Sequence, residues 1–408
     1  MSEQPHAFEG RAPCECGPAK ELTPNRTAMM AKQKNQGNIM IVDDPPANLK
    51  LLEDMLRQQG YRVRSFPRGR LALSAAVQQP PDLILLDITM PEMNGYEVCQ
   101  HLKSDQKLSR IPVIFLSALG DTADKVKAFQ SGGVDYVTKP FHFEEVQARV
   151  ETHVELRRLQ MESERRAAQE LEIAKQVQFR LFPQILPSLA TLDYAGSCIQ
   201  ARQVGGDCYD FLDLARDRLG LVIGDIAGKG IAAALLMATL QANLRSQRAF
   251  ALDQPQRFLR SVNELFYENT ADSAYATLFF ADYDDQAGCL RYANCGHPPA
   301  LLLRSDNSLE RLGATATVLG LFEEWDCSID ERQLFSGDIL ALYTDGITES
   351  FNDAEEEFGE QRLIEALRRH RELSSPALLA AIVDEVLRFS PHEQHDDVTL
   401  IVAKCRGN

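Results

Sequence analysis

The sequence lacks any long apolar stretch. No uninterrupted apolar run in its 408 residues approaches the roughly 20 residues that a bilayer-spanning helix needs. The best candidate, Ile231–Leu240, is too short and is rich in alanine, so it predicts a buried helix. The first residues also lack the charged and then apolar layout of a secretory signal. We therefore expect a cytoplasmic protein that does not enter the membrane.

An excess of basic residues and a cysteine framework are missing as well. The chain has 43 lysines and arginines against 59 acidic residues, a net charge of −16, so it would be repelled by a nucleic acid backbone. This balance excludes nucleic acid as a general partner. The nine cysteines are scattered, and only Cys14 and Cys16 lie close together, without the histidines or cysteines that complete a zinc site. Free thiols in a reducing compartment are expected.

The length fits two domains rather than one, and the pattern of polar and apolar residues changes several times along the chain. Residues 1–37 are polar and aperiodic, which predicts a flexible tail. Over residues 38–155, short apolar runs alternate with amphipathic stretches, beginning with Ile39–Val42 and Ala47–Gln58. About five such units predict an α/β doubly wound domain with a parallel sheet, whose site lies beyond the carboxyl ends of the strands.

Residues 143–182 form a distinct segment. From Phe143 to Phe182 there is neither glycine nor proline, and small or apolar residues recur at gaps of three and four. They are Val146, Val150, Val154, Ala167, Leu171, Ala174, Val177 and Leu181. The pattern predicts a long helical linker. A solvated spacer and a two-stranded coiled coil both fit it, and the stripe favours the coiled coil and hence a homodimer.

Residues 188–405 have a third pattern of polar and apolar residues. Strand-like runs, among them Leu219–Ile223, Ala276–Tyr283 and Val398–Val402, follow one another with separate helical stretches such as Ile231–Gln247 and Pro376–Phe389. Strands in tandem with segregated helices predict an α+β domain, a β-sandwich flanked by helices, rather than a second parallel sheet.

Charged residues in the first domain follow predicted strands. Asp43 and Asp44 follow the first strand, Asp87 ends the third, Ser117 ends the fourth and Lys139 follows the fifth. Because these strand ends meet at one edge of the sheet, three carboxylates should lie together, and a divalent cation such as Mg²⁺ would hold them. One carboxylate is then a candidate nucleophile towards a phosphoryl group.

The segments Ile41–Asp44, Leu85–Gly95 and Tyr136–Phe141 resemble the receiver domains of response regulators, which have a flavodoxin-like fold. The resemblance implies that Asp87 is the phosphoacceptor and that a sensor histidine kinase or phosphotransfer protein supplies the phosphoryl group. It implies Mg²⁺ ligands in Asp43, Asp44, Asp87 and the Thr89 carbonyl, phosphoryl contacts from Ser117 and Lys139, and a switching aromatic in Tyr136. A cis peptide bond between Lys139 and Pro140 is implied too.

Aspartates also recur in the second domain, where they lie beside glycines or at predicted strand ends. They are Asp207 and Asp210 in Val204–Asp210, Asp225 in Gly224–Gly230, Asp345 in Tyr343–Glu349, and Asp396 and Asp397 in Asp396–Leu400. A following glycine, such as Gly346, lets backbone and metal approach without a Cβ in the way. Separated aspartates without paired histidine or cysteine suit Mg²⁺ or Mn²⁺, and two such ions would activate water and clamp a phosphate.

This order of motifs resembles the metal-dependent, PPM-type (2C class) protein serine/threonine phosphatases, in the branch called SpoIIE-like. Asn294–Pro299 and the entry helix Leu171–Gln178 match further landmarks, and the resemblance covers residues 190 to 404. It implies Asp225 bridging two Mn²⁺ or Mg²⁺ ions, with Asp345, Asp396 and the Ile226 carbonyl on the metals and Asp207 bound directly or through water. Gly228 and Gly230 would shape the turn. Asp210 and Asp397 either support the ligands from outside or are turn residues, and the pattern favours the first role for both.

The same resemblance implies that the substrate is a phosphorylated anti-anti-sigma (STAS-domain) protein in a partner-switching pathway. The motifs identify no arginine dedicated to the substrate phosphate, and Arg202 is the nearest candidate. His297, between glycine and two prolines, fits a loop-packing role better than a general acid, and Lys229 fits a solvated surface charge.

Two other classes of function fit parts of the sequence. A catalytically silent adaptor that grips a sigma-factor regulator would lack some metal-binding aspartates, yet Asp207, Asp225, Asp345 and Asp396 are all present. A DNA-binding transcription factor would need a basic recognition helix, and the C-terminal region offers none. A receiver-controlled phosphatase is the function that we predict.

Overall fold

The computed structural model describes residues 36–118, 122–215, 217–270, 274–392 and 394–406. The chain divides into two compact units, Met1–Glu164 and Arg165–Asn408, and the division falls within the 37-residue helix α5 (Phe143–Phe179). Most of the predicted flexible tail, with Cys14 and Cys16, lies outside the described residues. Within them, no helix combines the length and apolarity that crossing a membrane requires.

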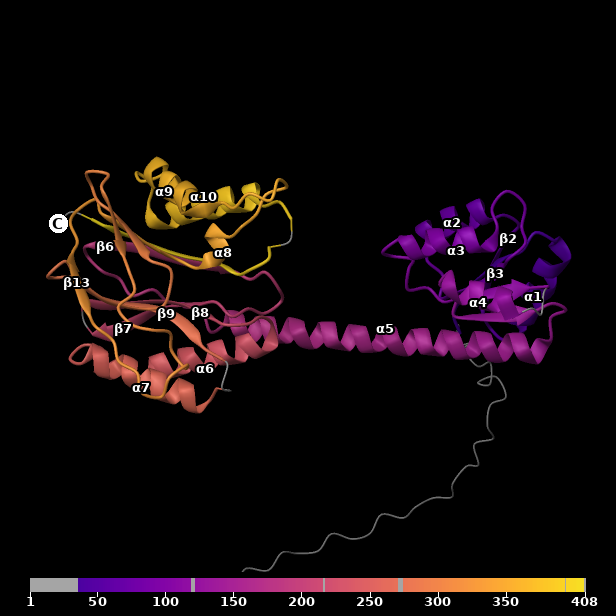
Figure 1. The fold of residues 1–408 in the computed structure, drawn as a ribbon, viewed down its shortest axis with the longest axis horizontal. Helices are drawn as coiled ribbons and strands as arrows, with labels where there is room; N and C mark the ends of the chain where they lie inside the picture. The colour runs from indigo at the N-terminus through magenta and orange to yellow at the C-terminus, as the bar shows by residue number, and fades with distance from the viewer. Residues whose placement is uncertain (1–35, 119–121, 216, 271–273, 393, 407–408) are drawn as a thin grey trace, which may run out of the picture. The chain divides into compact units, whose positions relative to one another are not determined.

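The first unit (Figure 1) contains one parallel sheet, and its strands have the order β2-β1-β3-β4-β5. Its strands are β1 (Asn38–Val42), β2 (Arg62–Phe66), β3 (Leu83–Asp87), β4 (Val113–Ser117) and β5 (Asp135–Thr138). The helices are α1 (Pro46–Gln58), α2 (Gly69–Gln78), α3 (Gly95–Ser104) and α4 (Thr122–Gln130), followed by α5. The predicted doubly wound α/β fold is confirmed.

Alternation along the strands produces a core on each face of this sheet. Met40 and Leu86 belong to one buried cluster with side chains of α2 and α3, whereas Ile41 and Leu85 belong to another with those of α1 and α5. Val146, Val150 and Val154 of α5 lie in this second cluster. The first three residues of the predicted linker stripe are therefore receiver core, and cannot form the seam of a coiled coil.

The second unit is built on two antiparallel sheets of five strands. One has the order β13 (Asp330–Gln333), β10 (Cys289–Cys295), β9 (Ala276–Asp284), β8 (Arg218–Ile226) and β7 (Cys208–Ala215). The other has the order β12 (Leu309–Leu312), β11 (Ala300–Leu303), β14 (Ile339–Tyr343), β15 (Val398–Cys405) and β6 (Leu192–Ile199). The predicted sandwich is confirmed, and β6, β7, β12 and β13 are strands that the sequence analysis did not predict.

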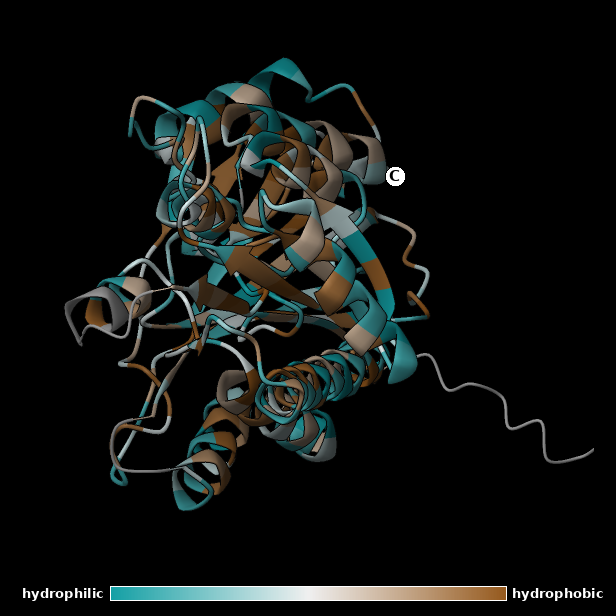
Figure 2. Cartoon of the chain, turned by 90° about the vertical axis from the view of Figure 1, so that its right-hand side faces the viewer, coloured by the Kyte–Doolittle hydropathy of each residue, from teal (hydrophilic) through white to brown (hydrophobic). Residues whose placement is uncertain are grey.

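Helices cover the outer faces of the sandwich (Figure 1). The helices α6 (Ile231–Gln247) and α7 (Pro255–Glu268) cover one sheet, with the short helix η1 (Arg248–Phe250) between them, and α9 (Gly359–Arg369) and α10 (Ser375–Phe389) cover the other. The short helix α8 (Asp345–Thr348) follows β14. Hydrophobic residues concentrate on the strands in Figure 2, as expected when both faces of each sheet are covered.

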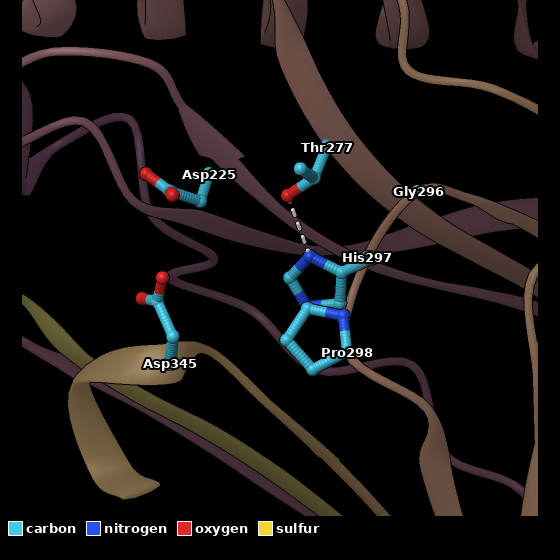
Figure 3. A pocket seen from close by; sticks show the side chains of 6 residues that line it. All are labelled: Asp225, Thr277, Gly296, His297, Pro298 and Asp345. Carbon is cyan, nitrogen blue, oxygen red and sulfur yellow. Dashed lines mark hydrogen bonds between the residues drawn. The ribbon is translucent and has the colours of Figure 1, made fainter. Parts of the chain in front are cut away.

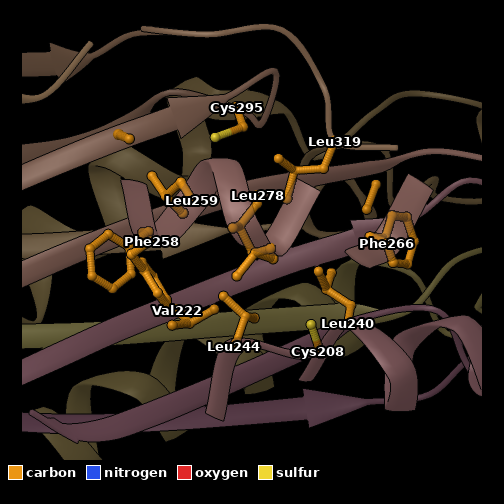
Figure 4. Close-up of a cluster of buried hydrophobic side chains, with 14 of the residues drawn as sticks. Cys208, Val222, Leu240, Leu244, Phe258, Leu259, Phe266, Leu278, Cys295 and Leu319 are labelled. Atoms are coloured by element: carbon orange, nitrogen blue, oxygen red, sulfur yellow. The ribbon is translucent and has the colours of Figure 1, made fainter. Parts of the chain in front are cut away.

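Three clusters of buried apolar side chains hold these layers together. One lies between the sheets and includes Phe279 and Leu340, and a second joins the α9 and α10 side to its sheet. The third packs α6 and α7 onto their sheet through Leu240, Leu244, Phe258 and Phe266 (Figure 4). The prediction that Ile231–Leu240 forms a buried helix is only half right, because Ile231 and Leu235 of α6 are exposed.

Candidate functional site

The edge of the receiver sheet gathers three carboxylates. Ligand oxygens of Asp43, Asp44 and Asp87 all lie within 4.8 Å of one another, as the sequence predicts. Lys139 Nζ stands 2.9 Å from Asp43 Oδ2 and 3.0 Å from Asp87 Oδ2, and Asn48 donates to Asp43 Oδ1 at 3.0 Å. One lysine cannot neutralise three close carboxylates, so this donor set fits a hard divalent cation.

The charges at this edge are strongly coupled. Burial raises the pKa of Asp87 and repulsion from Asp43 adds to it, whereas the hydrogen bond from Lys139 acts in the opposite direction. Burial alone would lower the pKa of Lys139, but its hydrogen bonds to Asp43 and Asp87 raise it. The lysine is thus held in its charged form beside Asp87, where it can neutralise charge on a phosphoryl group.

The remaining predicted receiver residues surround this cluster. Ser117 is buried at the end of β4, and its carbonyl accepts a hydrogen bond from the Lys139 amide at 2.7 Å. The Thr89 backbone hydrogen bonds to Asp87, and the Lys139–Pro140 peptide bond is cis, as predicted. The ring of Tyr136, a residue of β5, packs edge-on against Phe129.

In the second unit the aspartates come from four separate elements. Asp207 precedes β7, Asp225 lies near the end of β8, Asp345 opens α8 after β14, and Asp396 precedes β15. Asp225 and Asp345 line a cavity of about 320 Å³, which we call the His297 pocket (Figure 3). Asp225 also lines a smaller recess with Asp396 and Asp397. We call it the Lys229 recess, and Asp225 therefore stands at the point that the two hollows share.

Hydrogen bonds hold Asp207 and Asp397 in place. Asp207 Oδ2 accepts from the hydroxyls of Thr344 at 2.7 Å and Thr399 at 2.5 Å, and its side chain hydrogen bonds to Asp225. Asp397 accepts from the amides of Ala201 at 2.8 Å and Asp207 at 3.2 Å. Asp397 therefore holds the loop that carries Asp207.

Burial and then mutual repulsion of these carboxylates dominate the electrostatics of the site. Burial, together with repulsion from Asp345 and Asp396, raises the pKa of Asp225 to about 7. Burial also raises the pKa of Asp207 well above its usual range, with repulsion from Asp225 next in size. Two buried carboxylates in hydrogen-bond contact need either a proton or a cation between them. The donor set of Asp207, Asp225, Asp345 and Asp396 thus fits divalent cations with oxygen ligands.

Glycines make the close approach of these loops possible. A Cβ on Gly205 would collide with the Asp397 carboxylate, and one on Gly346 would collide with the Asp397 carbonyl. Gly228 and Gly230 have φ values of 111° and 79°, in the region that side chains disfavour. They turn the chain from β8 into α6 directly beside Asp225.

Known protein families match both parts of the chain that carry these sites. Residues 215–406 match the family described as Stage II sporulation protein E (SpoIIE), and residues 39–151 match the response regulator receiver domain. The chain is 31% identical over 255 residues to the phosphoserine phosphatase RsbU of Bacillus subtilis (strain 168), covering 62% of this chain and 73% of RsbU. The chain belongs to the SpoIIE family. It joins a receiver domain to a PP2C-type phosphatase domain.

Two further similarities concern single parts of the chain. The DNA-binding dual master transcriptional regulator RpaA of Synechocystis is 46% identical over 112 residues, which are 28% of this chain and 46% of RpaA. The SiaA-PP2C domain of Pseudomonas aeruginosa superposes with a TM-score of 0.52 at 18% identity, over 59% of this chain and 98% of that one. The second similarity supports the fold of the SpoIIE-family domain alone.

Two cationic residues of the SpoIIE-family domain stand beside the aspartates. Arg202 and Lys229 both line the Lys229 recess. Lys229 Nζ lies 2.7 Å from Asp396 Oδ2 and donates to the His395 carbonyl at 2.7 Å, although its side chain is 45% exposed. Lys229 is exposed, as predicted, but its pairing with Asp396, a predicted metal ligand, was not predicted.

His297 faces the aspartates across its pocket (Figure 3). Its Nδ1 hydrogen bonds to the Thr277 hydroxyl at 2.8 Å, and its backbone amide donates to Asn294 Oδ1 at 2.8 Å. Burial lowers the pKa of His297 to about 3. A neutral histidine locked between two strands agrees with the predicted packing role and does not suit a general acid at neutral pH.

Contacts between α5 and the Asp207 loop were not predicted. Gln178 donates from Nε2 to the Gly205 carbonyl at 2.8 Å and accepts from the Gly205 amide at 3.2 Å. After the helix, the Leu181 carbonyl accepts from Arg245 at 2.7 Å, and Arg245 Nε holds Asp210 Oδ2 at 2.6 Å. Through Arg245, Asp210 connects α6 to the end of the linker.

Proposed function

We propose that this chain is a response regulator in which phosphorylation of Asp87 controls a metal-dependent protein serine/threonine phosphatase. The observation that carries the proposal is the position of Asp225, which shares one hollow with Asp345 and another with Asp396 and contacts Asp207. A receiver domain on the same chain supplies the input. A sensor histidine kinase or a phosphotransfer protein would provide the phosphoryl group.

The roles follow from the geometry of each site. Asp225 would bridge two Mn²⁺ or Mg²⁺ ions, with Asp345, Asp396, Asp207 and the Ile226 carbonyl completing the ligands. When bound, such ions supply an activated water and neutralise charge on the phosphate. Asp397, Thr344 and Thr399 hold Asp207, so the ligand set is oriented before a substrate arrives. Arg202 stands where it can contact the substrate phosphate.

The substrate that we propose is a serine-phosphorylated STAS-domain protein of a partner-switching pathway. The support is the likeness to RsbU, a phosphoserine phosphatase. The assay is hydrolysis of p-nitrophenyl phosphate and of a phosphoserine protein by the full chain. Activity should appear with Mn²⁺ or Mg²⁺ and disappear with a chelator. A chain that is inactive with both metals and both substrates would instead be an adaptor.

The linker helix gives a physical route between the sites. Gln178 of α5 binds Gly205, two residues before Asp207, and Phe182 stacks on Tyr209 at 5.2 Å between ring centres. A shift of the helix would therefore move the Asp207 loop. Leu156, Leu159, Ile173 and Val177 are exposed on α5 with heptad spacing. We propose that they pair two copies of the chain, and that the receiver alters this pairing.

A further inference from the structure

The outer face of α6 is unusually apolar for a surface helix. The stretch Ile231–Leu244 contains no charged residue. At 100° per residue, Ile231, Leu235, Ala238 and Ala242 share one side, which we call the α6 apolar face. Ile231 is 57% exposed and Leu235 is 65% exposed, whereas Met237, Leu240 and Leu244 on the opposite side are buried. A helix that is apolar on both sides is normally covered on both sides.

The neighbouring helix α7 shows what an ordinary surface helix of this domain looks like. Its buried side carries Phe258, Val262 and Phe266, and its outer side carries the charged residues Arg257, Arg260 and Glu264. The two helices pack on the same sheet. The exposed outer face of α6 is therefore apolar, whereas that of α7 is charged.

The α6 apolar face begins at the wall of the Lys229 recess. Gly228, Lys229 and Gly230 line that recess, and Ile231 is the next residue and the first of α6. With a rise of about 1.5 Å per residue, Leu235 stands about 6 Å further along the helix. A phosphate held beside Arg202 and Lys229 would thus have the α6 apolar face directly next to it.

We propose that the α6 apolar face docks the body of a folded phosphoprotein substrate while its phosphorylated side chain enters the recess. The inference rests on the proposed phosphatase function and specifies its substrate class. The partner presents apolar side chains beside its phosphoserine, which pack on Ile231 and Leu235, and the alanines allow it to approach α6 closely. A small phosphate ester does not reach this face.

The test compares three substrates on the full chain with Mn²⁺. They are p-nitrophenyl phosphate, a serine-phosphorylated STAS-domain protein, and a short peptide carrying the same phosphoserine. The double variant Ile231→Ser/Leu235→Ser should lower kcat/KM for the phosphoprotein about tenfold or more, because central apolar contacts dominate an interface. Its kcat/KM for p-nitrophenyl phosphate and for the peptide should stay within about twofold of wild type. Leu373→Ser, which removes a 39% exposed leucine between α9 and α10, is the matched control.

Each other result overturns a defined statement. An unchanged kcat/KM for the phosphoprotein, or equal values for protein and peptide in the wild type, overturns the docking surface. A double variant that loses hydrolysis of all three substrates shows that the face supports the catalytic site rather than a partner. A change in oligomeric state, measured by sedimentation, would assign the face to a second copy of this chain. Absence of hydrolysis by the wild type contradicts the proposed function itself.

Discussion

Both domains bring aspartates together, but a lysine lies beside these aspartates in a different way in each domain. In the receiver, three carboxylates have ligand oxygens within 4.8 Å, and Lys139 bridges two of them with only 20% of its side chain exposed. In the described part of the phosphatase domain the aspartates form no such group of three. They lie around two hollows. The side chain of Lys229 is nearly half exposed and pairs with one carboxylate, that of Asp396.

Under the proposed function, this difference separates a site for one ion from a site for two. The receiver cluster is compact, and its lysine is part of the structure around Asp87. The phosphatase site is spread over four elements, and its lysine holds a single carboxylate at the rim. We therefore expect changes at Asp225 to remove function, and changes at Lys229 only to adjust metal binding.

The largest effect is expected at Asp225. Asp225→Asn should lower hydrolysis of a phosphoserine protein more than about 1,000-fold, because the residue shared by both hollows is lost. Asp213→Asn, at an exposed position of β7, should keep wild-type activity. Near-normal rates for Asp225→Asn at saturating Mn²⁺ would show that the two hollows are not one catalytic site.

The second effect concerns the helix that runs from one unit to the other. In the wild type, receiver phosphorylation should change the phosphatase rate by about 5- to 150-fold. Seven Gly/Ser residues inserted after Ser163 in α5 should remove this response and leave the basal rate intact. An insertion of seven strongly helix-forming residues keeps the heptad register and should preserve the response. A full response in the Gly/Ser variant would mean that the signal does not travel along α5.

The third effect is a pH dependence of stability. In the metal-free protein the pKa of Asp225 is raised to about 7, above its unfolded value. The folded state then keeps a proton that the unfolded state loses from pH 4 upwards. Relative to Asp225→Asn, the unfolding free energy of the wild type should fall by about 4 kcal/mol between about pH 4 and 7 and then level off.

Thermal unfolding of both proteins across this pH range, in a chelator and then in Mn²⁺, measures the effect. Mn²⁺ should reverse the order above pH 7, since it stabilises the folded state that binds it. A wild-type protein that gains stability over Asp225→Asn from pH 4 to 7 without metal would contradict the crowding of carboxylates described above.

The sequence predicted which charged residues lie together in the receiver, and the reason is topological. All its residues follow strands of one parallel sheet, whose carboxyl ends meet at one edge. The phosphatase site depends on pairs far apart in the chain, such as Asp207 with Asp397, 190 positions away. Motifs identified these aspartates, but not the contact of Gln178 with Gly205 or the pairing of Lys229 with Asp396. Both contacts require the packed sandwich.

The error at α6 has a different cause. An uncharged helix is normally buried on all sides, so its composition predicted burial for Ile231–Leu240. Composition does not distinguish a helix covered by its own chain from one that keeps an apolar face open. The exposure of Ile231 and Leu235 appears only once α6 is packed on its sheet.

The smallest effect is expected at Lys229. Lys229→Met should bind Mn²⁺ about two- to fivefold more tightly in calorimetric titration, because a partly exposed pair with Asp396 no longer competes with the ion. Arg388→Met, which removes the exposed ion pair with Asp384 on α10, should leave Mn²⁺ affinity unchanged. Weaker Mn²⁺ binding by Lys229→Met would mean that the lysine orders the site instead of competing for it.

The most direct measurement treats the full chain with acetyl phosphate and Mg²⁺ and then follows both mass and phosphatase rate. The wild type should gain one phosphoryl group and change its Mn²⁺-dependent rate by about 5- to 150-fold. Asp87→Ala should gain none and keep its untreated rate. Equal rates for the treated and untreated wild type, or the same phosphoryl gain on Asp87→Ala, would contradict control of the phosphatase through Asp87.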